Sequence, residues 1–188
     1  MGTLKRETNW GTTWGYDLNY YSKIFSFAAL NKIRLIGLNV PYQVVQLVSS
    51  SGFADLAPSL RRLLPPLDLD NGRHRKQFVD AIQGSMGHDA DPSSVQRMYE
   101  AQTLWDEYMA ESASSFVSKY PGQMLLVIAG IGHVQGRVGI PDRIAKRTGQ
   151  APFVVLPQQV GWTEGGLPDI KEPLGKEAAD WIWYTQDY

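Results

Sequence analysis

The spacing of apolar residues divides the chain into helical and strand-like segments. Apolar side chains recur on one helical face over Tyr20–Asn31, which predicts a helix there. A second helix is predicted over Pro41–Gly52, because proline suits a first helical turn and glycine tolerates the left-handed conformation at a helix end. The longest predicted helix begins at Asp91-Pro92 and carries an apolar stripe at intervals of three or four residues as far as Tyr120.

Short apolar runs predict three β-strands, Arg34–Leu38, Met124–Ala129 and Phe153–Leu156. The second run is apolar on both faces, which is typical of a central parallel strand. Because helical segments lie between the runs, the predicted fold class is α/β, a parallel sheet flanked by helices. The remainder, 158–188, is punctuated by glycine and proline and is predicted to be an irregular tail with a short amphipathic helix at Gly175–Trp183.

The order of these segments predicts a single α/β domain over residues 1–188 with a helical insertion at 54–90, where no strand candidate occurs. The chain begins with an aromatic-rich arm and a helix, and three strands are few for a doubly wound sheet. A sheet of only three strands would expose an edge strand, which proteins normally pair with another strand or cover. We therefore expect the chain to be a fragment that lacks an N-terminal βαβ portion, or receives it from another chain.

Composition narrows the functional classes. A chain of 188 residues with 43% hydrophobic and 20% charged residues is expected to form a soluble globular domain. Eighteen Lys and Arg against nineteen Asp and Glu leave a net charge of -1, which argues against nucleic acid as a partner. The absence of cysteine excludes disulfides and thiolate nucleophiles. No apolar stretch approaches the roughly 20 residues of a membrane-spanning helix, and no dinucleotide, phosphate-loop, zinc-protease or nucleophile-elbow motif occurs.

The loops that follow the predicted strands hold the candidate binding residues, since ligands of open parallel sheets lie beyond the carboxyl ends of the strands. Asn39 follows the first strand, and Gly130–His133 follows the second. The two glycines let the backbone approach a bulky group, and His133 offers an imidazole. Arg137 and Arg143 come next and suit a carboxylate, propionate or phosphate. The alternative is that His133 bonds a neighbouring loop and that both arginines are ordinary solvated or salt-bridged residues.

The other histidines and the carboxylates of the long helix are weaker candidates. His88 stands in a Met/Gly loop where it could close over a ligand, or simply be exposed to solvent. His74 stands among basic residues and is expected at the surface. Asp106 and Glu107 point about 100° apart on the helix, so they do not form the carboxylate pair of a glycosidase. Glu107 shares a face with Glu111, and we expect that face to be solvated.

Three segments in order carry a family resemblance: 34–41 (RLIGLNVP), 99–112 (YEAQTLWDEYMAES), and 129–143 with AGIGHV followed by GIPDR. They are similar to the haem-binding uptake proteins of the ChaN-like group in the Tiki/TraB-like superfamily. The resemblance covers most of the span from Tyr20 to Leu156. It implies an α/β core with a small helical subdomain and a pocket for haem or a related tetrapyrrole. It also implies capture, transport or storage rather than catalysis, and a homodimer in which two haems stack.

The resemblance also implies which residues meet the haem. A tyrosine holds the iron in the best-known relative, and Tyr99 is the candidate here. A phenolate ligand favours ferric iron and suits holding rather than oxygen activation. His133, Arg137 and Arg143 are expected on one wall of the pocket, with His88 and Asn39 as further binding candidates.

Two other functions stay open in the sequence. Metal-dependent proteases of the superfamily use the histidine of the GxxH motif together with an N-terminal glutamate, so a metal-dependent hydrolase with His133 as a metal ligand is the alternative. This chain contains the histidine without that glutamate motif. A purely structural or interaction domain is the third possibility, with Trp10 and Trp14 as docking residues. The segment Asn9–Tyr16 also resembles plastid-type relatives, which implies a chloroplast location.

Overall fold

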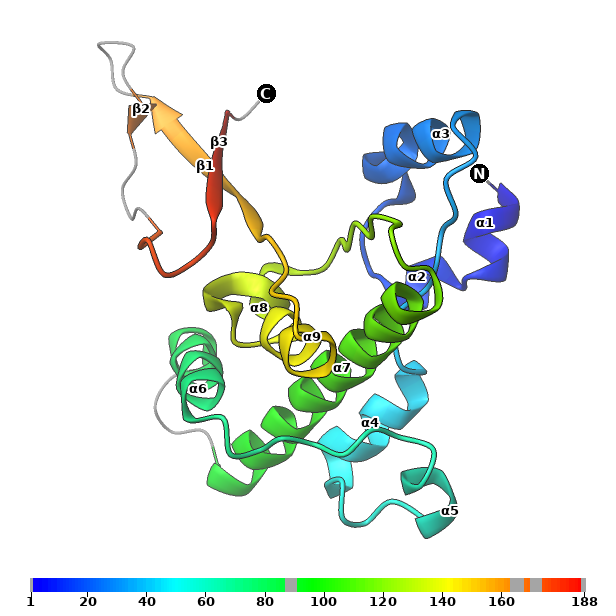
Figure 1. The fold of residues 1–188 in the computed structure, drawn as a ribbon. Coiled ribbons are helices and arrows are strands. Elements are labelled where there is room, and N and C mark those ends of the chain that lie inside the picture. The colour runs from blue at the N-terminus through cyan, green and yellow to red at the C-terminus, as the bar shows by residue number, and fades with distance from the viewer. Residues whose placement is uncertain (1, 87–90, 163–167, 170–173, 187–188) are drawn as a thin grey trace. The chain divides into compact units, whose positions relative to one another are not determined.

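The structure, a computed structural model, describes residues 2–86, 91–162, 168–169 and 174–186 (Figure 1). Its contacts divide the chain into two compact units, Met1–Gly37 and Leu38–Tyr188. Helices predominate, and a small sheet with one parallel strand pair completes a mixed α/β fold, as predicted. Among the described residues, none of the helices is both long enough and apolar enough to cross a membrane.

The first unit is held together by aromatic rings. It contains α1 (Gly2–Glu7), α2 (Trp10–Thr13), η1 (Leu18–Tyr21) and α3 (Ser22–Leu30), and α3 confirms the first predicted helix. The Trp10 ring lies 5.4 Å from that of Tyr21 and 5.6 Å from that of Phe25, both edge-on. Its indole N–H donates to the carbonyl of Tyr16 at 2.7 Å. The aromatic residues of the arm therefore pack mainly against one another.

The second unit is built on one long helix, α7 (Pro92–Lys119). It also contains α4 (Tyr42–Ser51), α5 (Pro58–Arg61), α6 (Gly72–Met86), α8 (Ile131–Val134), η2 (Gln135–Arg137) and α9 (Ile140–Thr148). The carboxylate of Asp91 accepts a 2.9 Å bond from the backbone N–H of Ser94 and so caps α7. Gly149, with φ 71°, ends α9 in the left-handed conformation. The helices predicted from Pro41 and from Asp91-Pro92 are confirmed, with their expected start and stop residues.

Two of the hydrophobic clusters in the core of the second unit lie against α7. In one cluster, Val44, Val45 and Val48 of α4 pack with Ala101 and Leu104 of α7. In the other, Met109 and Ala110 of α7 pack with Ile140 of α9, and Ala129 contacts this cluster from the segment before α8. The helix α7 is therefore the element that positions both neighbours.

The sheet lies in the C-terminal part, in the order β2-β1-β3. The strands are β1 (Val155–Trp162), β2 (Pro168–Asp169) and β3 (Trp181–Gln186); β1 pairs with β3 in parallel and with β2 in antiparallel fashion. The predicted third strand is present, but it begins two residues later than predicted and extends as far as Trp162. The helix predicted at Gly175–Trp183 is wrong: β3 begins at Trp181, because the aromatic and β-branched run from there to Thr185 favours a strand.

The segment predicted as a strand, Met124–Ala129, has no regular secondary structure and forms no ladder with any strand of the described residues. Its side chains still alternate: Met124, Leu126 and Ile128 are exposed, and the three residues between or after them are half-buried. The first predicted strand, Arg34–Leu38, likewise belongs to no strand of the sheet that the structure describes. An alternating pattern sets which way side chains point, whereas a strand also needs a neighbour that accepts its hydrogen bonds. The predicted insertion at 54–90 and tail at 158–188 stay predictions.

Two leucine substitutions, one in the buried core and one in the exposed positions of 124–129, test this packing. Leu104→Ala, in the fully buried face of α7, should lower the free energy of unfolding by about 2–5 kcal/mol because it leaves a cavity. Leu126→Ala, whose side chain is 79% exposed, should change it by less than about 0.5 kcal/mol. Chemical denaturation followed by circular dichroism measures both, and equal losses would contradict the exposed position of Leu126.

Candidate functional site

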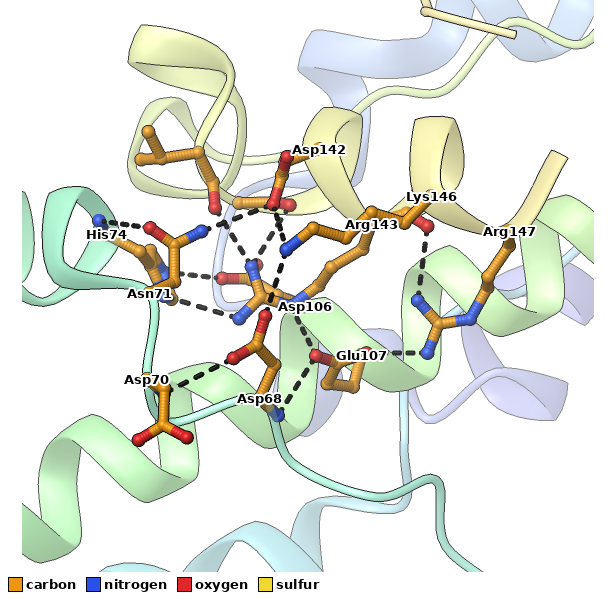
Figure 2. A network of polar contacts seen from close by, with 12 residues as sticks. Asp68, Asp70, Asn71, His74, Asp106, Glu107, Asp142, Arg143, Lys146 and Arg147 are labelled. Carbon is orange, nitrogen blue, oxygen red and sulfur yellow. Dashed lines mark hydrogen bonds and ion pairs between the residues drawn. The ribbon is translucent and has the colours of Figure 1, made fainter. Parts of the chain in front are cut away.

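Two neighbouring acids of α7, Asp106 and Glu107, are buried at the centre of a polar network (Figure 2). One carboxylate oxygen of Asp106 lies 2.6 Å from Nδ1 of His133 on α8. The other oxygen lies 2.9 Å from Nε2 of His74 on α6. A single carboxylate therefore meets imidazoles from two elements that lie far apart in the sequence.

His74 is buried, with 1% of its surface exposed, so the prediction that it lies at the surface is wrong. Arg73 and Lys76 beside it are exposed, whereas His74 lies on the face of α6 that meets α7. Its ring lies 5.3 Å from the ring of Tyr99. The Tyr99 hydroxyl lies 3.2 Å from Nδ1 of His74, and Nη2 of Arg143 lies 3.3 Å from the same nitrogen. Its burial could have been found from the apolar stripe of α6, on which Phe78 follows it after one helical turn.

Glu107 is also buried, which overturns the expectation that it faces solvent with Glu111. Nε of Arg143 donates to one of its oxygens at 2.8 Å, and Nη2 of Arg147 donates to the other at 2.5 Å. The backbone N–H of Asp68 also donates to the oxygen that Arg143 contacts, at 3.3 Å. Two guanidinium groups of α9 thus hold an acid of α7 out of water.

Arg143 has 1% of its surface exposed. Besides its bonds to Glu107 and His74, its Nη1 donates to the carbonyls of Val138 and Gly139 at 2.9 and 3.1 Å. All the contacts of this guanidinium group are therefore inside the protein. It does not share an open cleft with Arg137 or His133 in this structure.

The segment Gly139–Arg143 (GIPDR) explains how α9 reaches this network. A Cβ at Gly139 would lie 2.2 Å from the carbonyl oxygen of His133, so only glycine permits this close approach of the two backbones. Ile140 enters the core, and Pro141 occupies the first turn of α9. Arg143 then falls one turn later on the side of α7.

His133 is the partly exposed member of the network, with 19% of its side chain accessible to solvent. Its Nδ1 faces Asp106, and the edge of its ring meets Trp105 at 5.9 Å. The amide nitrogen Nε2 of Gln102 lies 2.9 Å from the same Nδ1. Rotating this amide exchanges its nitrogen and oxygen, so the oxygen can take that place and accept from an N–H. In the described part of the chain no partner is recorded for Nε2, the nitrogen on the other side of the ring.

The ionisation of Asp106 decides which nitrogen of His133 carries the proton. Burial raises the pKa of this carboxyl, but the hydrogen bonds and charges of His133 and His74 outweigh burial and hold the pKa below its ordinary value of 3.8. Asp106 is therefore an ionised acceptor at neutral pH. Nδ1 of His133 must then be the donor, which leaves a lone pair on Nε2.

Arg137 lies in η2, between α8 and α9, and is tied to the C-terminal part of the chain. Its guanidinium group pairs with Asp180 at 2.6 Å and donates to the carbonyl of Glu177 at 3.1 Å. The preceding residue, Gly136, donates its backbone N–H to Ala178 at 2.8 Å. Arg137 also borders an open cavity of about 580 Å³, together with Arg73, Lys146 and several acids.

The other predicted site residues lie elsewhere. Asn39 is exposed and makes no contact with this network. Tyr99 is fully buried, and burial raises the pKa of its hydroxyl, which is the opposite of what an iron-bound phenolate needs. These observations argue against Tyr99 as the iron ligand. His88 lies outside the described residues.

The described residues contain no group of three or more His, Asp or Glu side chains arranged to hold a metal ion. His74, Asp106 and His133 are close together, but each histidine nitrogen that faces Asp106 meets a different oxygen at hydrogen-bond or ion-pair distance. The role of His133 as a metal ligand therefore stays a prediction that depends on its other nitrogen.

The sequence of this chain is similar to that of a known protein family. The sequence model of the family described as "Haem-binding uptake, Tiki superfamily, ChaN" matches residues 1–144. The chain belongs to this family. The match includes α6, α7 and α8 and ends within α9, one residue after Arg143, so it contains His74, Asp106, Glu107, His133 and Arg143, whereas Arg147 lies beyond it. No curated protein and no solved structure matches the chain.

The buried pair of Glu107 and Arg143 should be costly to break. Glu107→Gln removes one partner and leaves the buried guanidinium of Arg143 without its counter-charge, so the free energy of unfolding should fall by about 3–5 kcal/mol. The exposed pair Lys76–Asp80 gives the control: Asp80→Asn should cost at most about 1 kcal/mol. Urea denaturation compares them, and a Glu107→Gln loss no larger than the control would contradict the buried pair.

Proposed function

We propose that this protein binds haem or a closely related tetrapyrrole through Nε2 of His133, and that it captures or stores the ligand rather than transforming it. The observation that carries the proposal is the 2.6 Å bond between Nδ1 of His133 and Asp106. Histidines that bind metals usually donate the other ring N–H to such an acceptor, which fixes the tautomer and raises ligand basicity. Membership of the haem-binding uptake family supports the same ligand.

The residues around His133 fit a flat, largely apolar group. Ile128 and Ile131 are 46% and 51% exposed, and both precede His133 closely in the chain. The indole of Trp105 closes one side of the imidazole. Exposed apolar side chains that are close to His133 in the chain suit a flat, largely apolar macrocycle, whose iron His133 would bind through Nε2.

Carboxylate groups of such a ligand would need cationic partners. Arg137 follows His133 by four residues and is about one third exposed, and Arg73 and Lys146 border the same cavity as Arg137. A guanidinium group can hold a carboxylate with two parallel bonds. Arg137 is paired with Asp180, and Lys146 with Asp68 and Asp142, but these pairs are partly exposed, so a ligand carboxylate could compete for the cations. Arg143 is instead buried against Glu107 and His74, so we assign it no contact with the ligand.

Capture is favoured over catalysis by the surroundings of His133. Bound haem would supply an iron centre with one histidine ligand. The chain would hold the imidazole through Asp106 and shield one side of it with Trp105. Beside His133, the described residues supply no further acid or base in contact with Nε2 that could move a proton to a substrate.

Titration of ferric haem into the protein tests the proposal. The native chain should shift the Soret band at a defined stoichiometry, and His133→Ala should weaken binding at least tenfold because the axial nitrogen is lost. Tyr99→Phe and His88→Ala should leave both the spectrum and the affinity close to native.

These variants separate the candidate iron ligands. Loss of the Soret shift in Tyr99→Phe with retention in His133→Ala would contradict the assignment and favour a phenolate ligand. Equal, weak spectra in all four proteins would contradict specific haem binding altogether. Loss of the Soret shift in His88→Ala alone would instead assign His88 as the residue that binds the iron.

A further inference from the structure

We infer that His74 and Arg143 are positioning residues: acting through Asp106, they fix the proton of His133 on Nδ1 and leave its Nε2 free to bind a ligand. The inference rests on the proposed function in one respect, since it takes Nε2 of His133 as the nitrogen that meets the ligand. It assigns a purpose to two buried residues that do not reach the ligand themselves.

The first step is the tautomer of His74. The two groups recorded at its Nδ1 are the Tyr99 hydroxyl at 3.2 Å and Nη2 of Arg143 at 3.3 Å. A guanidinium group has donors and no acceptor. Nδ1 of His74 must therefore accept, and the single ring proton of His74 must sit on Nε2.

The second step is the contact that this proton makes. Nε2 of His74 lies 2.9 Å from one oxygen of Asp106, in a place where both side chains are almost fully buried. A buried carboxylate is unfavourable unless polar partners replace the water it has lost. His74 lies against this oxygen at ion-pair distance, which leaves the other oxygen of Asp106 to accept from His133 at 2.6 Å.

The third step is the rigidity of Arg143. Glu107 holds its Nε, and the carbonyls of Val138 and Gly139 hold its Nη1, so Nη2 stays directed at His74 (Figure 2). Gly139 closes the arrangement from the same side, since a Cβ there would lie 3.3 Å from the Asp106 oxygen that faces His74. A substitution of Arg143 should therefore alter the position of the ring proton of His133, although the two side chains make no contact with each other.

Nuclear magnetic resonance of the ring nitrogens tests this chain of contacts in the native protein without a ligand. The sequence has three histidines, so single substitutions assign every signal. We expect the neutral Nε2–H tautomer for His74 and the neutral Nδ1–H tautomer for His133 at neutral pH. A proton on Nδ1 of His74, or on Nε2 of His133, would overturn the inference.

The variant His74→Phe keeps a ring of similar size and removes the N–H that faces Asp106. His133 should then lose its preference for the Nδ1–H form, and haem affinity should fall by about 10–100-fold, the usual effect of removing an outer partner of a metal-binding histidine. Phe78→Leu is the matched control, because Phe78 also packs on Tyr99, at 5.5 Å between rings, but belongs to no contact with Asp106. It should leave the tautomer of His133 unchanged.

The outcomes distinguish this inference from the proposed function. If His74→Phe folds and His133 stays in the Nδ1–H form, the positioning role is wrong even where haem binds. If the tautomer responds but haem binds neither protein, the positioning role stands and the haem proposal fails. If His74→Phe does not fold, the tautomers of the native protein still decide the inference.

Discussion

The second unit of this protein depends on one buried negative charge. Asp106 stands in the middle of α7, and its two oxygens meet His74 of α6 and His133 of α8. Removing a carboxylate from water is unfavourable unless donors replace the water. The positions of α6 and α8 beside α7 are therefore limited to those in which both imidazoles contact Asp106. The constraint that stabilises the fold thus also determines the chemistry of His133.

A second buried acid belongs to the same network and adds further contacts to it. Glu107 follows Asp106 in the chain but points to a different side of α7, where Arg143 and Arg147 of α9 meet it. Arg143 also contacts His74, so the two acids belong to one network. An isolated ion pair in a protein interior is weak evidence of stability. A network that fixes three helices around one partly exposed imidazole instead favours a role in orienting that imidazole.

Local signals in the sequence were enough to predict the helices that begin at Pro41 and at Asp91-Pro92, since Gly52 and Asp91 act on their own neighbours. The importance of the loop carrying His133 was also visible, because glycines beside a histidine stand out in any chain. The burial of His74 and Glu107 was not, since a charged residue is buried only when distant partners arrive. The strand ladder expected at Met124–Ala129 failed for the same reason: pairing is a property of two segments.

The ionisation of Asp106 tests the account most directly. Because its pKa is lower in the folded protein than its ordinary value of 3.8, the carboxylate stabilises the fold above about pH 4, and this stabilisation is lost as the pH falls through the folded-state pKa. The carboxyl ¹³C signal of Asp106, followed from neutral pH downward in the folded protein, should remain that of a carboxylate at pH 4. A midpoint of titration above 3.8 would show a neutral acid between the two imidazoles, and would contradict the account.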